Sequence, residues 1–187
     1  MKKMATLFII ASSAFILTGC LTTMTLQGEP PLAVRPGKAP VAAFVMHEYD
    51  PGVGVHAQKK LAACLQQRNV FDFVPQQKVD SALSAGGYDI ARISGLSAGE
   101  YMKIAKATGA DYVIFGNLRV VKALKLNGWR HDIYSLFYLA DGKTGEVLDS
   151  WRSDTIGAFA DPASELDPKK MAESVANHTC AKIVERK

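Results

Sequence analysis

The sequence is poor in cysteine, in charge of one sign and in long apolar runs. Three cysteines in 187 residues are too few for a domain held together mainly by disulfides. Charged residues make up 21% of the chain and the net charge is only +4, a balance too mild to indicate nucleic-acid binding. With 48% hydrophobic residues, the composition excludes disorder and predicts about one folded domain.

Motifs of catalytic and metal sites are also missing. The chain has no G-x-S-x-G, no G-x-x-x-x-G-K-[ST] and no cysteine beside an evident base. The four histidines never occur at the spacing of a metal-binding pair: His47, His56, His131 and His178. We therefore expect no metal, no cofactor and no enzymatic activity.

One pattern resembles a dinucleotide-binding fingerprint. Gly52, Gly54 and Ala57 form G-x-G-x-x-A between a predicted strand and a predicted helix. However, four residues separate the strand from the first glycine, and no acidic residue ends the following strand. We expect the motif to shape a loop before a helix, and we keep a nucleotide-dependent enzyme as the less favoured alternative.

The first twenty residues have the pattern of a lipoprotein leader. Two lysines precede an uncharged, mostly apolar run from Ala5 to Leu17, too short for the roughly 20 residues of a membrane span. The run ends in Leu17-Thr-Gly-Cys20, which resembles the bacterial lipobox. We predict a signal peptide over 1–19 and acylation of Cys20, so that fatty acyl chains such as palmitate anchor the protein in a membrane.

The residues after Cys20 predict the location and a tether. Leu21 replaces the Asp that marks inner-membrane retention in enteric-type bacteria, which favours the outer membrane with the folded part in the periplasm. Five Gly and Pro residues between Leu21 and Ala39, with no apolar period, predict a flexible tether over 20–39. The globular domain is then residues 40–187.

Apolar periodicity and turn signals in this domain predict the order βαβααβββα. This is a single α/β (α+β) domain, with a mixed sheet that ends in an antiparallel meander and is flanked by helices. The expected strands are 41–46, 70–74, 112–126, 130–140 and 146–156, and the expected helices are 55–69, 76–84, 98–108 and 168–185.

Two cysteines remain beside Cys20. Cys64 and Cys180 each fall on the apolar face of a predicted helix. They are either small buried apolar residues or, because periplasmic thiols are oxidised, partners in a disulfide.

Residues 130–140 are apolar on both faces of the predicted strand. Ile133, Phe137 and Leu139 alternate with Tyr134, Leu136 and Tyr138, whereas a strand with one wet face alternates apolar and polar residues. Either both faces are covered within the monomer, or the face of Tyr134, Leu136 and Tyr138 meets a partner. Trp129 and Trp151, on or near this meander, are core residues or interface anchors.

Three segments together resemble a known family. They are Val41–Glu48, which fits V-A-x-F-x-x-x-E, Ala105–Gly116, which fits A-x-x-x-G-A-D-Y-V-I-x-G, and Leu139–Leu148, which contains D-x-x-T-G-E-V. The chain is similar to the CsgG-like, TolB N-terminal-like and LpoB-like (PelC-like) bacterial envelope domains. The resemblance covers about residues 40–185 and supplies no catalytic residue.

This resemblance implies a lipoprotein that acts by protein–protein contact. The expected role is an accessory or scaffold in secretion, export or assembly of the cell envelope, with envelope or secretion proteins as partners and a homo-oligomer as one possible state. The alternative that the family offers is a regulator of a peptidoglycan synthase.

Overall fold

The computed structural model describes residues 22–27, 39–50, 52–89, 95–125, 128–155 and 167–185. Its elements follow the order β1 β2 α1 β3 α2 α3 β4 β5 β6 α4. The predicted α/β class and the predicted order from the first domain strand onward are confirmed. Cys20 and the leader lie outside the described residues.

Four helices form where the apolar spacing predicts them. They are α1 (Val53–Gln67), α2 (Gln76–Ala85), α3 (Ala98–Thr108) and α4 (Pro168–Glu185). In α1 the fully buried residues Ala57, Leu61 and Leu65 recur every four positions. At the start of α3, Glu100 accepts hydrogen bonds from the Ser97 backbone and hydroxyl, which completes a capping box and lowers the pKa of the Glu100 carboxyl.

The described strands form one mixed sheet of six strands in the order β1-β6-β5-β4-β2-β3. The strands are β1 (Thr22–Gln27), β2 (Val41–Glu48), β3 (Asp72–Phe73), β4 (Tyr112–Lys125), β5 (Gly128–Asp141) and β6 (Val147–Thr155). β2 is parallel to β3 and β4, as the helical crossovers require, and β4, β5 and β6 form the predicted antiparallel meander.

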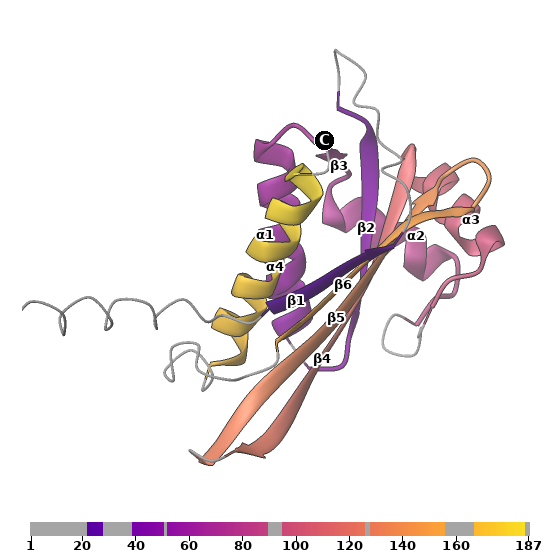
Figure 1. Ribbon diagram of the computed structural model, residues 1–187. Coiled ribbons are helices and arrows are strands. Elements are labelled where there is room, and N and C mark those ends of the chain that lie inside the picture. The colour runs from indigo at the N-terminus through magenta and orange to yellow at the C-terminus, as the bar shows by residue number, and fades with distance from the viewer. Residues whose placement is uncertain are drawn as a thin grey trace, which may run out of the picture.

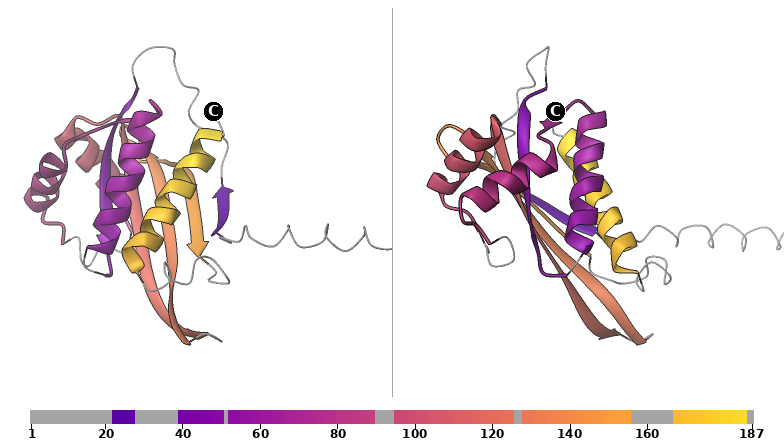
Figure 2. Two further views of the ribbon diagram at one scale, coloured as in Figure 1. Left: turned by 90° about the vertical axis from the view of Figure 1, so that its left-hand side faces the viewer. Right: turned by 180° about the vertical axis from the view of Figure 1, so that it is seen from behind.

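Helices cover both faces of the sheet (Figures 1 and 2). α1 and α4 lie side by side on the first face and bury Phe44, Ile133, Phe137, Leu139 and Trp151. α2 and α3 lie on the second face, where they bury a smaller cluster that includes Val45 and Phe115. The core therefore has two halves, one on each side of the sheet.

Cys64 of α1 and Cys180 of α4 form a disulfide, with a Cα–Cα distance of 6.2 Å. Further along the two helices, Glu173 accepts a 2.8 Å hydrogen bond from Lys60 and lies 3.4 Å from His56. The amine of Lys60 and then the His56 ring lower the pKa of the Glu173 carboxyl. The two helices are thus joined covalently near one end and by charge near the other.

The prediction of a tether throughout 20–39 is wrong for Thr22–Gln27. These six residues form β1, which pairs antiparallel with β6, from Thr22 opposite Thr155 to Gln27 opposite Ser150. Three threonines give the segment β propensity, and β6 offers it an otherwise open edge. This long-range pairing has no signal in local periodicity. Among the described residues, no helix is long and apolar enough to cross a membrane.

Candidate functional site

The second face of the sheet is covered by helices over only part of its length. On this face of β4, Val113 and Phe115 are fully buried under α2 and α3, but Asn117 is half-buried and Arg119 is exposed. Exposure on this face of β5 also increases toward the hairpin: Ala140 is buried, Tyr138 is half-buried and Tyr134 is 43% exposed. The helical cover therefore ends near the middle of these strands.

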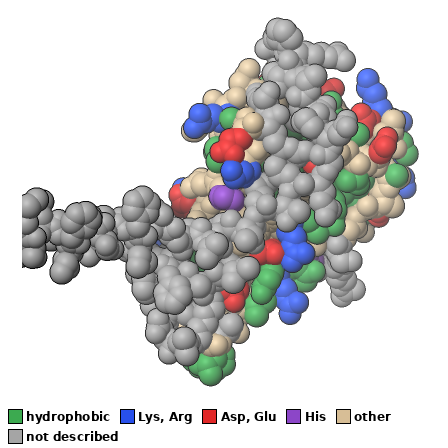
Figure 3. All heavy atoms as spheres, viewed as in Figure 1, with side chains coloured by type: hydrophobic (Ala, Val, Ile, Leu, Met, Phe, Trp, Pro, Cys, Tyr) green, Lys and Arg blue, Asp and Glu red, His purple; other side chains and the backbone are tan. Residues whose placement is uncertain are grey.

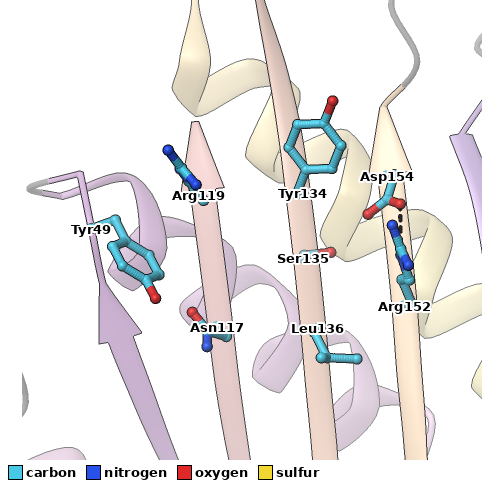
Figure 4. Close-up of a pocket in the computed structure, with 8 residues that line it drawn as sticks. All are labelled: Tyr49, Asn117, Arg119, Tyr134, Ser135, Leu136, Arg152 and Asp154. Atoms are coloured by element: carbon cyan, nitrogen blue, oxygen red, sulfur yellow. Dashed lines mark hydrogen bonds and ion pairs between the residues drawn. The ribbon is translucent and has the colours of Figure 1, made fainter. Parts of the chain in front are cut away.

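The uncovered part forms a shallow groove of about 260 Å³, which we call the open groove. Figure 4 shows its lining side chains, which come from the loop after β2 and from β4, β5 and β6. The lining residues are Tyr49, Asn117, Arg119, Tyr134, Ser135, Leu136, Arg152 and Asp154. Arg119 lies opposite Tyr134, and Asn117 lies opposite Leu136, in the register of β4 and β5.

Short polar contacts fix the loop that carries Tyr49. The Val120 backbone N–H donates a 2.8 Å hydrogen bond to the Asp50 carboxylate, which holds the loop beside β4. The Tyr49 ring packs edge-on against His47, with 4.2 Å between ring centroids. Tyr49 is nevertheless 51% exposed, so a preorganised aromatic ring faces solvent at the rim of the groove.

The two arginines of the groove differ in their partners. Arg152 donates a 2.7 Å hydrogen bond to Asp154, whose side chain is only 12% exposed. Arg119 has no carboxylate partner among the described residues. The groove thus offers one uncompensated guanidinium between two tyrosines, a group that can pair with a carboxylate or stack on an aromatic ring.

The residues predicted as interface candidates lie in three different places. Tyr134 and Leu136 line the open groove, whereas Tyr138 packs against the cluster under α2 and α3. Trp129 is 55% exposed near the far end of the β4–β5 hairpin. Trp151 is core, because it is 1% exposed on the first face and its indole N–H donates to Asp149 at 2.7 Å. The interpretation of Trp151 as an interface anchor is therefore wrong.

Both interpretations of the doubly apolar strand hold in part. The face of Ile133, Phe137 and Leu139 is covered within the monomer by α1 and α4. The opposite face is covered at Tyr138 and open at Tyr134. An interface on this strand is therefore confined to its Tyr134 half.

A second and larger hollow, of about 940 Å³, lies between α1, α2 and the edge of β2. Its wall includes Phe44, Met46, Phe73 and Leu83. The Gln58 amide, 5% exposed, spans this region by donating to the Phe44 carbonyl at 2.8 Å and to Gln76 at 2.9 Å. The hollow is mainly apolar, and these bonds occupy the amide of Gln58.

The glycine motif serves the local packing of α1. Gly52 precedes the helix with φ of 79°, a left-handed conformation that favours glycine, and Ala57 is fully buried in the cluster shared with α4. These small residues are explained without a nucleotide. No group of three His, Cys, Asp or Glu side chains among the described residues is arranged to hold a metal ion.

Sequence reasoning missed six of the lining residues: Tyr49, Asn117, Arg119, Ser135, Arg152 and Asp154. For Asn117 and Arg119 a signal is present in β4, where alternate residues on one face change from Val113 and Phe115 to Asn117 and Arg119. Such a change along one face marks the point where a covering helix ends. Tyr49 has no comparable signal, because its position depends on the loop that Asp50 ties to Val120.

Comparison with known proteins supports the fold. No protein-family model and no curated protein matches this chain. The PelC dodecamer from Paraburkholderia phytofirmans is similar in structure, with a TM-score of 0.51 and 16% identity over 87% of this chain and 97% of the PelC chain. A single-residue PelC variant from the same organism gives a TM-score of 0.52 at 16% identity, over 86% and 98% of the two chains.

Two other solved structures resemble the chain more loosely. Lipoprotein GNA1162 from Neisseria meningitidis has a TM-score of 0.47 and 16% identity, over 74% of this chain and 99% of that one. The LpoB C-terminal domain from Salmonella enterica has a TM-score of 0.45 and 19% identity, over 64% and 84%. The likeness to PelC confirms the expected fold, and at this level of identity it bears on the fold alone.

Proposed function

We propose that this chain is a periplasmic lipoprotein, anchored in the outer membrane through Cys20, that acts by protein–protein contact. Its role is that of an accessory or scaffold protein in secretion, export or assembly of the envelope. The observation that carries the proposal is the open groove, where Tyr49, Arg119 and Tyr134 stand exposed on a rigid sheet. Tyrosine and arginine are among the side chains most enriched at the centres of protein interfaces.

The membrane anchor is supported by the sequence before the fold. The lipobox ends at Cys20, and acyl chains contribute roughly 0.8 kcal/mol for each buried CH₂ group. Leu21 favours the outer membrane over the inner one. A disulfide between Cys64 and Cys180 fits an oxidising compartment such as the periplasm.

We propose binding rather than catalysis. The polar groups of the groove are guanidinium, amide, hydroxyl and carboxylate groups, and none of its described lining residues is a histidine or a cysteine. The Ser135 hydroxyl is buried and donates a 2.6 Å hydrogen bond to the Ser153 carbonyl. A thermal-shift screen with nucleotides tests this point. A nucleotide that raises the melting temperature, by more at higher nucleotide concentration, would favour the enzyme alternative.

The partner of the groove is another folded protein, either a second copy of this chain or an envelope protein. The dodecameric state of PelC, which has the same fold, supports testing for a homo-oligomer first. Arg119 calls for a carboxylate or an aromatic ring on the partner, because it is exposed and has no carboxylate partner among the described residues.

The test uses the acylated protein with Arg119→Glu or Tyr134→Asp. Native mass spectrometry of the solubilised protein measures the oligomer, and cross-linking in cells followed by purification measures other partners. Lys103→Glu, on the exposed side of α3, makes the same charge change as Arg119→Glu away from the groove and serves as control. We expect both groove variants to stay folded and to lose the contact that the control retains. Unchanged contacts in both groove variants would contradict the proposal.

A further inference from the structure

The β4–β5 hairpin projects beyond the rest of the sheet (Figure 1). β4 and β5 pair over their whole length, but β2 accompanies β4 only to Leu118, and β6 accompanies β5 only to Tyr134. Residues 120–125 and 128–133 therefore form a two-stranded ribbon to which no further strand of the described residues pairs, and we call this ribbon the hairpin end. An isolated two-stranded hairpin is only marginally stable in water, so this ribbon is held mainly by the part of β4 and β5 that lies within the sheet and leaves its own faces open to a contact outside the monomer.

The hairpin end is both basic and apolar. It carries three basic residues, Lys122, Lys125 and Arg130, and one acidic residue, Asp132, in a chain that is otherwise nearly neutral. Leu124 is 68% exposed, and its cross-strand partner Trp129 is 55% exposed. Lys122 Nζ lies 5.5 Å from the centre of the Trp129 ring. Figure 3 shows hydrophobic side chains at this lower end of the molecule.

This composition matches the boundary between lipid headgroups and acyl chains. Tryptophan concentrates at that boundary because its ring is apolar and its N–H is polar. Lysine buries its apolar stem there while its ammonium meets anionic headgroups. A protein partner would equally cover Leu124 and Trp129, but an interface core is usually depleted in lysine.

The register of β1 places the chain's N-terminal side at the same end of the sheet. β1 begins at Thr22, two residues after Cys20, and Thr22 pairs with Thr155 next to the pair of Asp154 with Tyr134. The six residues from Tyr134 back to Gly128 then extend on the order of 20 Å further in that direction. Both views of Figure 2 show the hairpin extending past the start of β1.

Helices α1 and α4 begin at this end as well. α1 follows the end of β2, which runs parallel to β4 toward the hairpin. α4 runs alongside in the same sense, because Lys169 lies near Gly52 at the start of α1, and Cys180 bonds Cys64 further on. Lys169 and the neighbouring Lys170 are exposed, so they add positive charge near the ribbon.

We infer that the hairpin end is a second membrane contact, in which Leu124 and Trp129 enter the interface and the surrounding lysines bind anionic headgroups. The orientation rests on the proposed acylation of Cys20, since β1 joins that residue to the same end of the sheet. Anchor and hairpin would then seat the domain directly on the bilayer with a fixed orientation, instead of leaving it free on a tether.

Trp129 itself reports on this contact. The full-length acylated protein is reconstituted into vesicles of phosphatidylglycerol and phosphatidylcholine in equal parts, or of phosphatidylcholine alone, with brominated acyl chains as quenchers. Trp151 is buried in the core and stays unquenched, and Trp129→Phe removes the responsive signal. We expect quenching of Trp129 in the anionic vesicles, and a fatty-acid label on the same sample verifies the anchor.

The charge requirement is tested without the anchor. Cys20→Ala protein is sedimented with the anionic vesicles, alone or combined with Lys122→Glu and Lys125→Glu. At about 1 kcal/mol per basic residue near an anionic surface, the two reversals should weaken binding by at least about tenfold. Lys103→Glu with Lys143→Glu gives the same change of net charge away from the hairpin and should retain binding.

These outcomes separate the two proposals. If the protein carries the fatty-acid label but its Trp129 fluorescence is not quenched in anionic vesicles, the proposed membrane contact is overturned and the proposed anchor still stands. If the protein carries no fatty-acid label, the proposed anchor is overturned. If the Cys20→Ala protein nevertheless sediments with anionic vesicles, and does so only with Lys122 and Lys125 present, the membrane contact of the hairpin end still stands. Equal binding by the hairpin and control charge variants would also overturn the contact.

Discussion

The sulfur atoms of Cys64 and Cys180 are bonded to each other across 116 positions of sequence. The bond joins α1 to α4, the two helices that cover the first face of the sheet, and Cys180 is fully buried. Because α4 is the last element and α1 follows the first strand of the predicted domain, the disulfide closes nearly the whole folded chain into one loop.

We predict that removing this bond with Cys64→Ala and Cys180→Ala lowers the free energy of unfolding substantially. A loop of this length gives an upper value of about 4–5 kcal/mol in the chain-entropy model. Urea unfolding of the oxidised protein and of the double variant measures the difference. Peptide mapping without reductant that recovers both cysteines as free thiols would show that the disulfide does not form, and the prediction would then fail.

Cys20→Ala should leave the protein unprocessed or mislocalised. The lipobox cysteine is the proposed site of acylation, and alanine has no thiol to accept the acyl group. Metabolic labelling with a radioactive fatty acid checks this, with the double alanine variant of Cys64 and Cys180 as the control that keeps its label. Label on the Cys20→Ala protein would contradict the prediction.

Gly145→Ala should destabilise the domain much more than Gly87→Ala. Both glycines have φ of 71°, so an alanine at either position costs roughly 1–2 kcal/mol of backbone strain. A Cβ at Gly145 would also collide with the backbone of Ala98 at the start of α3, whereas nothing lies within 4 Å of a Cβ at Gly87. Overpacking of this kind adds about 1–3 kcal/mol. Thermal melts of the two variants measure the difference. Equal melting temperatures would contradict the prediction, because they would show that the Ala98 backbone shifts away from the new Cβ without loss of stability.

Stability should fall between pH 10 and 12 partly because of Tyr101. Burial, followed by the nearby Tyr138 and Glu100, raises the pKa of Tyr101 to about 12. In the unfolded chain the hydroxyl has the ordinary tyrosine pKa of 10.0, so the stabilisation is fully present below pH 10 and is lost as the pH rises to 12. The effect is about 3 kcal/mol at most. Urea midpoints across this range should fall less steeply for Tyr101→Phe than for the wild type.

Tyr134→Phe is the matched control for that experiment, because Tyr134 is exposed. It should keep the alkaline loss of the wild-type protein. If Tyr101→Phe shows the same alkaline loss as wild type and control, the Tyr101 hydroxyl does not contribute to it.

Local sequence signals predict most of the fold, because most of its elements are decided locally. Ser97 and Glu100 mark the start of α3, and the apolar spacing of Ala57, Leu61 and Leu65 marks α1. β1 was not predictable in this way, since its strand structure depends on pairing with β6, more than a hundred residues later.

The site was only partly predictable for a similar reason. The doubly apolar strand indicated Tyr134 and Leu136, but which half of that face stays open depends on where α2 and α3 end. That boundary is set by tertiary packing and separates Tyr138, packed under the helices, from Tyr134 in the groove. Tyr138→Asp should therefore destabilise the protein, because it places a charge against the apolar cluster under α2 and α3, whereas Tyr134→Asp should leave its stability nearly unchanged.

The central claim is that the open groove is a protein contact surface in the cell. The most direct measurement is site-specific cross-linking in the native host, with a photoreactive amino acid in place of Tyr134 and, as control, in place of Met102, which is 38% exposed on α3. The account predicts a discrete cross-linked protein, either a second copy or one envelope partner, from position 134 and none from position 102. No adduct at 134, or the same adduct from both positions, would contradict it.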